Sequence, residues 1–523
     1  MFKKSDIVAA ALVSVGAAAY TWFFFDRGLD LFDEGLYATE AQRVLDGGVY
    51  GRDFLAPYGP GRYYLIAGVF ALFGASLKVQ AGLFLLLRGL AAALFYSLSR
   101  SVLPRGISVV MALALTLAHG ALHKSFFQCA VLVNIAAWFA YRRSRTPAAC
   151  AAAGAVCGAS ALFRVDAGLF AAVSFVTLFA LELLWDRPAG SLGVFLKKMG
   201  AFLLGAALVA GPVALAVLWA GDLEMVLRAE VQRTANLIRF SDSVTVPGFA
   251  QALADHSLKK ILLSIMIPAA PVALIALGLL ALFFRIRRDD QRGGLEILAV
   301  AVFGLPVLNQ LRITPTFNHL LQSVPLALLA ATILLHRMAP WARSRGGRRA
   351  LRRIAVTATA IIPAAVLVFF NLAMTKADNR VPGSIRNRWA FEEPIALARA
   401  GLHEKAGAAR ELERVVSAIR AETESTDTIL TGPYAPALHF LSERRPAVPY
   451  LEPFYYFASE RGQAVMIDGL EKNRPVLVIL GGPVESVGGQ TLMRDAPLVD
   501  RYIRLRYRPH SVVGRYRILK RIE

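Results

Sequence analysis

The sequence predicts a polytopic α-helical membrane protein of about eleven transmembrane helices with a C-terminal soluble α/β domain. Of its 523 residues, 56% are hydrophobic and only 18% are charged, an apolar excess beyond what the core of a soluble domain needs. The apolar residues gather in long runs, and after residue 373 these runs shorten and charges of both signs mix. The first feature indicates a membrane domain, and the second indicates a soluble domain after it.

Eleven apolar runs are candidates for membrane spans. The first lies in MFKKSDIVAAALVSVGAAAYTWFFF and holds about 20 apolar residues, enough to cross a bilayer core of roughly 30 Å. No small-residue cleavage site follows it cleanly, so we expect an uncleaved first helix with Lys3 and Lys4 in the cytoplasm. The other runs lie at roughly 78–99, 106–120, 125–140, 147–163, 167–185, 199–219, 260–284, 294–311, 318–335 and 353–373.

The runs between 106 and 163 are the weakest part of this pattern, because each is near or below the lower limit of about 17 residues. A helical hairpin in this stretch could be drawn differently. Two spans more or fewer would leave the topology of the rest of the chain unchanged.

The basic residues predict the orientation of the chain. With a cytoplasmic N-terminus, the short cytoplasmic loops are rich in Lys and Arg, as in YRRSR, RIRRDDQR and HRMAPWARSRGGRRALRR. The outer loops before residue 374 are longer and hold fewer basic residues, so the positive-inside rule supports this orientation. The formal net charge of +21 is therefore explained by topology, without a nucleic-acid partner.

The cysteine and histidine residues do not have the spacing of disulfides or of a metal site. The cysteines Cys129, Cys150 and Cys157 all fall inside apolar runs, which is typical of small core residues and not of disulfides. The eight histidines are scattered without ligand spacing, so we expect no structural or catalytic zinc. No cofactor is predicted with certainty, and a divalent cation remains possible.

We expect two domains. Residues 1–373 form the transmembrane domain, with long outer loops at 26–77 and 220–259, and residues 374–523 form the extracytoplasmic α/β domain. The patterns of the second domain predict helices at AARELERVVSAIRAET, APALHFLSE and near YYFASERGQAVMIDGLE. They predict strands at DTILTG, RPVLVILGG, YIRLRYR and VGRYRILKR.

The first outer loop places two adjacent carboxylates, Asp33 and Glu34, a few residues after the first span. Further along the loop, GRYYLIAGVFALFG is apolar and aromatic but too short to cross a bilayer, which suits a helix on the outer interface. Such a helix would place the acidic pair at the mouth of a membrane cavity. Two solvated loop acids are the plainer alternative.

This loop resembles a known family of enzymes. The acidic pair, then YATEAQRVLDGG, then DFLAPYGPGRYYLIAGVFALFG, is similar to the GT-C fold of integral-membrane glycosyltransferases. The resemblance is greatest to the bacterial relatives of protein O-mannosyltransferases and lipid A aminoarabinose transferases. The local motif covers about 50 residues, and Gly59-Pro60 stands where relatives often have Pro-Pro, so the substrate of no single branch is carried over.

The resemblance implies a lipid-linked donor, usually a polyprenyl-phosphate sugar, whose sugar passes to an acceptor on the outer face. It also implies that Asp33 is the catalytic base, and an acceptor hydroxyl that attacks the anomeric carbon does need a carboxylate to take its proton. Direct displacement with one base would invert the anomeric configuration. Glu34 could orient Asp33, bind the acceptor or help to bind a divalent ion.

A polyprenyl-phosphate leaving group needs cationic partners for its developing charge. Arg164 and Asp166 lie in a tight turn between two spans and resemble a short motif of some relatives; an ion pair that caps two helix ends is an equal alternative. Arg312 and His319 flank a later span, where an interfacial Arg is the plainer reading. Weaker candidates are Arg62, with the neighbouring Tyr63, and Lys124.

Arg88 lies about ten residues inside the second span. A lone charge at the centre of a membrane helix costs on the order of 3 kcal/mol on insertion scales, so Arg88 should face the protein interior or a polar cavity. Asp33 and Asp166 are its nearest plausible partners in the predicted topology. We favour a structural or site-supporting role.

The remaining loops are less specific. The loop DLEMVLRAEVQRTANLIRFSDSVTVPGFAQALADHSLKK has helical apolar spacing, which favours an amphipathic interface helix over a lid. Gly482-Pro483 follows a predicted strand without a dinucleotide-binding fingerprint. Aromatic residues of the C-terminal domain could stack on sugar rings or pack in its core: Tyr434, Tyr450, Phe454, Tyr455 and Tyr456.

Together these features predict a glycosyltransferase of a bacterial inner (plasma) membrane, multi-pass, with the C-terminal domain in the periplasm. Its partners would be a lipid-linked sugar donor, membrane lipids and a glycan, lipid or protein acceptor. Two alternatives remain: a multi-pass transporter or flippase of a lipid-linked glycan, and a non-catalytic scaffold. Transporters more often show repeated halves with broken helices, and no such repeat is visible.

Overall fold

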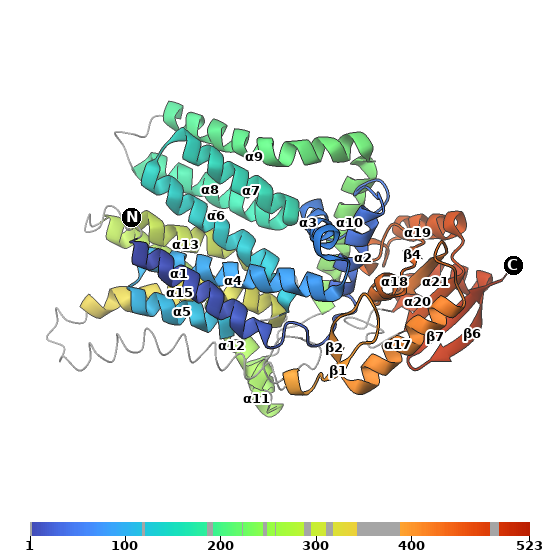
Figure 1. The fold of residues 1–523 in the computed structure, drawn as a ribbon. Helices are drawn as coiled ribbons and strands as arrows, with labels where there is room; N and C mark the ends of the chain where they lie inside the picture. Colours follow the sequence, from blue (N-terminus) through green and yellow to red (C-terminus); the bar gives the residue numbers. More distant parts are fainter. Residues whose placement is uncertain are drawn as a thin grey trace. The chain divides into compact units, whose positions relative to one another are not determined.

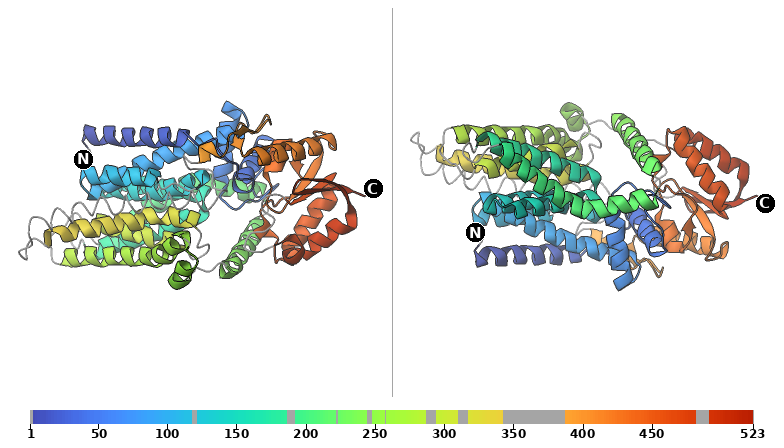
Figure 2. Two further views of the ribbon diagram at one scale, coloured as in Figure 1. Left: turned by 90° about the horizontal axis from the view of Figure 1, so that it is seen from below. Right: turned by 90° about the horizontal axis from the view of Figure 1, so that it is seen from above.

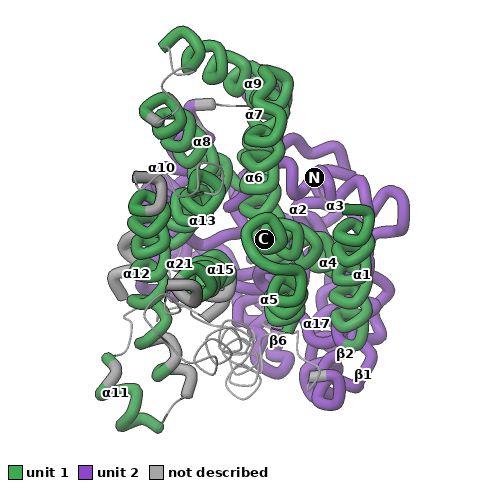
Figure 3. The backbone as a smooth tube through the Cα atoms, turned by 90° about the vertical axis from the view of Figure 1, so that its left-hand side faces the viewer, with its two compact units in different colours: residues 1–23, 84–212, 245–379 green, residues 24–83, 213–244, 380–523 purple. Residues whose placement is uncertain are grey.

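A computed structural model of the chain describes residues 3–117, 121–185, 192–221, 223–243, 248–256, 258–286, 294–309, 317–341, 387–481 and 491–522. The chain divides into two compact units (Figure 3). The helical unit comprises residues 1–23, 84–212 and 245–379, and the second unit comprises 24–83, 213–244 and 380–523. The second unit therefore groups the first long loop and residues 220–244 of the second long loop with the C-terminal residues.

The helical unit consists of apolar helices, several of which run side by side in the views of Figures 1 and 2. Its long neighbours in sequence, α6, α7 and α8, pack on one another, and α13 packs against α6 and α8. The helices are α1 (Lys4–Trp22), α4 (Leu77–Val102), α5 (Arg105–Leu117), η1 (Leu122–Lys124), α6 (Ser125–Ser144), α7 (Pro147–Phe163), α8 (Val165–Trp185), α9 (Leu192–Ala220), α11 (Phe249–Ala254), α12 (Leu258–Ile286), α13 (Gly294–Val307) and α15 (Phe317–Trp341).

The helices confirm a polytopic membrane protein. Among the described residues, five helices are long and apolar enough to cross a bilayer, and four more are shorter apolar helices. Each predicted run up to 318–335 has a helix, and the run at 353–373 lies outside the described residues. The stretch between 106 and 163 holds α5, α6 and α7, of which only α6 exceeds 17 residues.

Small residues let α7 and α9 approach closely. A Cβ atom at Gly154 of α7 would lie 1.8 Å from the carbonyl oxygen of Phe202, and one at Gly205 of α9 would lie 1.9 Å from that of Ala151. Close backbone approach at glycine is the usual way in which membrane helices gain packing contacts without a hydrophobic driving force. A buried cluster of aromatic rings, which includes Trp138 and Phe175, fills the space between neighbouring helices.

The second unit contains a five-stranded mixed sheet of order β4-β3-β5-β7-β6. Strands β4, β3 and β5 are parallel, and β7 and β6 continue the sheet antiparallel (Figure 1). The strands are β3 (Thr428–Gly432), β4 (Arg445–Pro446), β5 (Leu477–Gly481), β6 (Tyr507–Val513) and β7 (Tyr516–Arg521), with a separate pair β1 (Glu393–Pro394) and β2 (His403–Glu404). The helical elements are η2 (Asn387–Trp389), α17 (Ala406–Ala421), α18 (Ala437–Ser442), η3 (Pro453–Tyr455), α19 (Glu460–Asn473), α20 (Leu492–Asp495) and α21 (Pro497–Arg506).

Most predicted elements of this α/β region are confirmed, and one is wrong. The segment YIRLRYR was predicted to be a strand, but α21 occupies most of it and β6 begins only at Tyr507. Pro497 starts the helix at its first turn, and the buried side chains Val499, Tyr502 and Ile503 recur at helical spacing. Arg501 lies between these residues, and arginine is a good helix former, so local propensity and the buried apolar face both favour the helix.

The two long loops contribute helices to the second unit. The first loop forms α2 (Asp33–Leu45) and α3 (Pro60–Phe73), and the second forms α10 (Leu223–Ser243). The helix predicted at GRYYLIAGVFALFG is confirmed as α3, which exposes Leu72 and Phe73 at its end. Helix α2 was not predicted, and it carries the acidic pair in its first turn.

Candidate functional site

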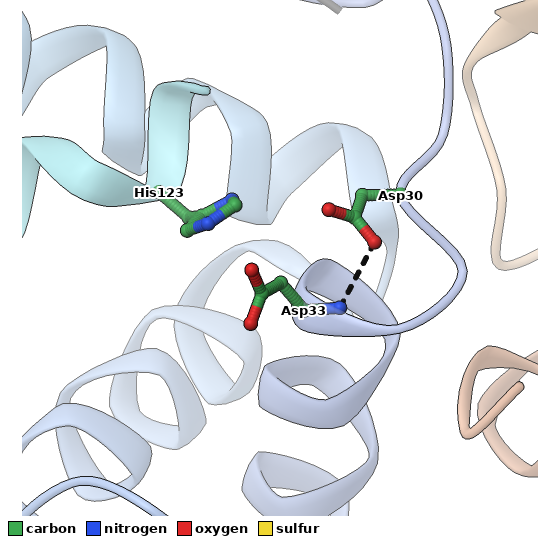
Figure 4. A group of neighbouring side chains, drawn as sticks. All are labelled: Asp30, Asp33 and His123. Carbon is green, nitrogen blue, oxygen red and sulfur yellow. Dashed lines mark hydrogen bonds between the residues drawn. The ribbon is translucent and has the colours of Figure 1, made fainter. Parts of the chain in front are cut away.

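Asp33 begins α2 after a turn built around Asp30. One carboxylate oxygen of Asp30, Oδ1, accepts hydrogen bonds from the backbone N–H groups of Phe32 and Asp33, each at 3.0 Å. Figure 4 shows the bond to Asp33 and the Asp33 carboxylate pointing away from the helix start. A short acidic side chain that satisfies free N–H groups before a helix fixes the entry of the chain. The position of Asp33 is therefore set by Asp30, which sequence reasoning missed.

Glu34 points into the protein, unlike its neighbour. It is only 6% exposed, whereas Asp33 is partly exposed. A carboxylate oxygen of Glu34 accepts from the backbone N–H of Asp30 at 3.4 Å, and its carbonyl oxygen accepts from the Gln80 side chain at 3.0 Å. The two adjacent acids thus differ in environment: Glu34 is buried at the turn, and Asp33 is partly exposed.

Tyr37, one turn further along α2, packs with Tyr58 and Arg62. Burial and the nearby Tyr58 and Asp33 raise the pKa of Tyr37 well above its ordinary value. The Arg62 guanidinium carbon lies 4.1 Å from the centre of the Tyr58 ring and 4.9 Å from that of Tyr37. Arg62 itself is 2% exposed, and its guanidinium packs against these two rings, which are tilted by 58° to each other.

Tyr63 is a core residue of the same unit. Its ring lies 6.4 Å from the Tyr50 ring, in a stacked arrangement, and 6.3 Å from the Phe54 ring, edge to face. Burial raises its pKa well above the ordinary value, so the hydroxyl stays neutral. Tyr63 packs among these rings, and its predicted part in substrate binding stays a prediction.

Glu40 is a buried acid on α2. Neither carboxylate oxygen has a hydrogen-bond partner among the described residues, and the nearest charge is Arg43 Nε at 3.4 Å. Burial raises the pKa of Glu40 to about 7, and Arg43 opposes this rise. His439 of α18 is also fully buried, and burial followed by the charge of Arg43 lowers its pKa to about 3.

Helix α10 is attached to the C-terminal residues by a polar group of side chains. Arg233 Nε donates to Glu452 at 2.6 Å, and the Asn236 amide donates to the carbonyl oxygens of Phe454 at 2.8 Å and Phe457 at 2.6 Å. The Tyr455 hydroxyl donates to Glu230. Burial raises the pKa of Glu452, Arg233 opposes the rise, and Asp33 is among the weaker charges that add to it.

Several residues of this site were missed by sequence reasoning. Asp30 could have been found as a capping acid before a helix, but Arg233 and Glu452 are 219 residues apart and share no local signal.

The five candidate aromatics of the C-terminal domain are all buried in it, and Tyr450 stacks on Tyr455 with ring centres 5.1 Å apart. Gly482-Pro483 lies outside the described residues.

The remaining candidates belong to the helical unit. Arg164 and Asp166 form a two-point ion pair at 2.7 and 2.9 Å between the end of α7 and the start of α8. Arg88 is 4% exposed within α4 and lies in the electrostatic range of Cys129 and Tyr20. Arg312 lies outside the described residues, and the structure does not describe the side chain of His319. Their roles stay predictions.

The acidic turn has the ligand types of a divalent cation site. One carboxylate oxygen of Asp30 and one of Asp33 lie within 4.8 Å of each other. Carboxylate oxygens at such a spacing can share a magnesium or calcium ion. The same Asp30 carboxylate also caps the turn, so the presence of an acid at this position is explained without a metal ion.

These observations define a polytopic membrane protein with an accessible carboxylate at the start of its first-loop helix. Neither a protein-family model nor a curated protein sequence matches the chain. Among solved structures, the chain is similar to ArnT from Cupriavidus metallidurans bound to undecaprenyl phosphate, at 14% identity and a TM-score of 0.51. The match covers 99% of this chain and 98% of that chain. It shows that the chain has the GT-C fold that the first loop predicts.

A second similar structure is the archaeal oligosaccharyltransferase AglB from Archaeoglobus fulgidus in complex with an inhibitory peptide and a dolichol-phosphate. It is 15% identical, with a TM-score of 0.48, and the match covers 98% of this chain and 73% of that chain.

Proposed function

We propose that this protein is a glycosyltransferase that moves a sugar from a polyprenyl-phosphate-linked donor to an acceptor on the extracytoplasmic face of the membrane. The observation that carries the proposal is the contrast between two adjacent acids, in which Glu34 is buried and Asp33 is partly exposed at a turn held by Asp30. A fixed, accessible carboxylate is what a general base requires.

Asp33 accepts the proton of the acceptor hydroxyl as that oxygen attacks the anomeric carbon. The bond from the anomeric carbon to the phosphate oxygen breaks on the opposite face, so the configuration inverts. The polyprenyl phosphate leaves with its negative charge, which cationic groups stabilise. Arg62 supports this site through Tyr37 and Tyr58, because it is buried beneath their rings.

The leaving phosphate needs at least one cation that reaches it. Arg164 and Arg312 are the candidates for this role, and an exchange of either for glutamine would raise the KM for the donor. The GT-C fold and the undecaprenyl phosphate bound to ArnT support a polyprenyl-phosphate donor for this chain. The positive-inside pattern supports a periplasmic location for the first loop and the C-terminal domain.

The test is sugar transfer by purified protein in lipid nanodiscs, with a radiolabelled polyprenyl-phosphate sugar and envelope extract as acceptor. Asp33→Asn should lower the rate of polyprenyl phosphate release by about 10²- to 10⁴-fold, the usual range for loss of a general base, with donor affinity preserved. Asp46→Asn is the matched control, because Asp46 is an exposed acid at the other end of α2.

Near-normal release by the Asp33→Asn variant would remove the assigned base. A transporter would move the labelled donor across a sealed vesicle without breaking the bond between sugar and phosphate. A scaffold would show neither release nor movement. The three classes therefore give three different results in one set of measurements.

A further inference from the structure

Helix α10 presents its polar face to the C-terminal residues and leaves apolar side chains exposed. Arg233 and Asn236 are one turn apart and both contact residues 452–457, whereas Leu227 and Val231 are 56% and 71% exposed. The described contacts of α10 with this segment include an ion pair and two hydrogen bonds from a side-chain amide. Charged and amide groups hold α10 in place, and such bonds are strong when their atoms are shielded from water.

The segment that α10 holds has little regular structure of its own. Residues 452–457 contain one turn of 3₁₀ helix, η3, and the Asn236 amide satisfies two of its carbonyl oxygens. The Arg233 and Glu452 side chains are 15% and 7% exposed at their 2.6 Å contact. The removal of one partner would leave a buried charge without its neutralising group, which is more costly than the loss of both.

The segment leads directly to the turn that carries Asp33. The Phe457 ring packs edge to face on Tyr434 with centres 6.4 Å apart, and Tyr434 packs edge to face on Phe32 at 5.3 Å. Phe32 immediately precedes Asp33. Side chains of the second loop, the C-terminal domain and the first loop therefore form one continuous set of contacts.

We propose that Arg233 and Glu452 are a positioning pair for the transfer reaction: they fix residues 452–457 and, through Phe457, Tyr434 and Phe32, the turn that presents Asp33. This inference rests on the proposed function. It gives α10 and the C-terminal domain an indirect part in the reaction, because they position Asp33 through packed side chains. Neither Arg233 nor Glu452 needs to touch the substrate.

The chain offers a matched control on the same helix. Arg228 and Glu224 also form an ion pair on α10, but their side chains are 54% and 63% exposed. Exposed pairs contribute little to stability. Arg228→Met, Glu224→Gln and their combination should leave transfer and backbone exchange unchanged.

The experiment is a double-mutant cycle with Arg233→Met, Glu452→Gln and the double variant, read in two ways. Each single variant should lower kcat by about tenfold or more with a smaller change in the KM for the donor, and the double variant should be no worse than the poorer single variant. Hydrogen exchange of the backbone should rise in residues 223–243, in 452–457 and at Phe32–Asp33 in both single variants.

Two results would overturn the inference. The first is that the single variants raise hydrogen exchange in α10 but leave kcat and hydrogen exchange at Phe32–Asp33 unchanged. The pair would then stabilise only the contact between α10 and residues 452–457. If the two substitutions add independently, they do not act as a pair. Should the wild-type protein transfer no sugar at all, the proposed function fails, and the exchange at Phe32–Asp33 still decides whether the pair orders that turn.

Discussion

Gly35 of α2 lies directly against Ala437 of α18. A Cβ atom at Gly35 would lie 2.4 Å from the Ala437 backbone nitrogen, and that nitrogen donates to the carbonyl oxygen of Leu31 at 3.1 Å. The Thr39 hydroxyl donates to the Pro436 carbonyl oxygen at 2.9 Å, one turn further along. The helix that begins with Asp33 is therefore packed, backbone to backbone, on the C-terminal α/β region.

Gly35→Ala should damage both stability and transfer, because the obstructing atoms belong to the backbone and cannot rotate away. We expect a loss of about 1–3 kcal/mol in the free energy of unfolding and a lower kcat. Thermal unfolding in detergent and the transfer assay measure the two effects. Gly68→Ala is the control, since a Cβ there meets nothing within 4 Å; an equal effect of both changes would contradict the predicted contact.

Asp30 should tolerate asparagine and not alanine, if its role is to cap the turn. Asparagine caps about as well as aspartate, and the loss of a cap typically costs about 1 kcal/mol. Asp30→Asn should therefore keep transfer within a few-fold of the wild-type rate, and Asp30→Ala should lower both stability and transfer.

The same pair of variants tests a metal role for Asp30. A divalent ion held by Asp30 and Asp33 would make Asp30→Asn as inactive as Asp30→Ala, and chelation with EDTA would abolish transfer by the wild type. Transfer that survives both EDTA and the Asn variant assigns Asp30 to the turn alone.

Glu40 should make the protein less stable as the pH rises through the neutral range. Its pKa is about 7 in the folded protein and near 4.5 when unfolded, so the folded state binds the extra proton between these values. The stabilisation is complete below about pH 4.5 and is lost as the pH approaches 7, a change of about 3 kcal/mol. Glu40→Gln should abolish this loss and raise the unfolding temperature at pH 7.5.

His439 gives the opposite slope in an overlapping range, because its pKa is lowered to about 3 and its protonation favours the unfolded state. The comparison should therefore be the difference between wild type and Glu40→Gln at each pH. Glu460→Gln, a change of an exposed acid, is the control. A pH-independent difference between Glu40→Gln and wild type would refute the assignment.

Arg62 should not be replaceable by lysine. Lysine keeps the charge but loses the flat guanidinium that packs on Tyr58 and Tyr37, so Arg62→Lys should cost about 1–2 kcal/mol and slow transfer. Arg52→Lys, at an exposed arginine of the same loop, should change little. Equal melting temperatures for Arg62→Lys and wild type would show that the stacking is unimportant.

Much of the membrane domain could be predicted because bilayer thickness imposes a local rule on sequence. The apolar runs place the described membrane helices, and the short aromatic run of the first loop is confirmed as α3. The strand β5 was equally visible as a continuous apolar run, which is typical of a buried parallel strand, and β3 was visible as a short stretch rich in β-branched residues.

Other elements depended on what packs against them. The arginine-rich segment before β6 became α21 because Val499, Tyr502 and Ile503 are buried together at helical spacing. The second-loop helix was expected on apolar grounds, yet the described contacts that anchor α10 to residues 452–457 are polar. Hydrophobic periodicity alone could not indicate which face would be covered.

The sequence by itself determined that this is a membrane protein with a C-terminal α/β region, and it pointed to Asp33 through a local motif. Only the tertiary structure decided that Glu34 is buried, that Asp30 holds the turn, and that Arg233 meets Glu452. Membrane spans and helix starts depend on residues that are close together in the sequence, because a membrane span or a helix end involves only a short stretch of chain. Contacts between residues hundreds of positions apart leave no such local pattern, so they appear only when the folded chain brings them together.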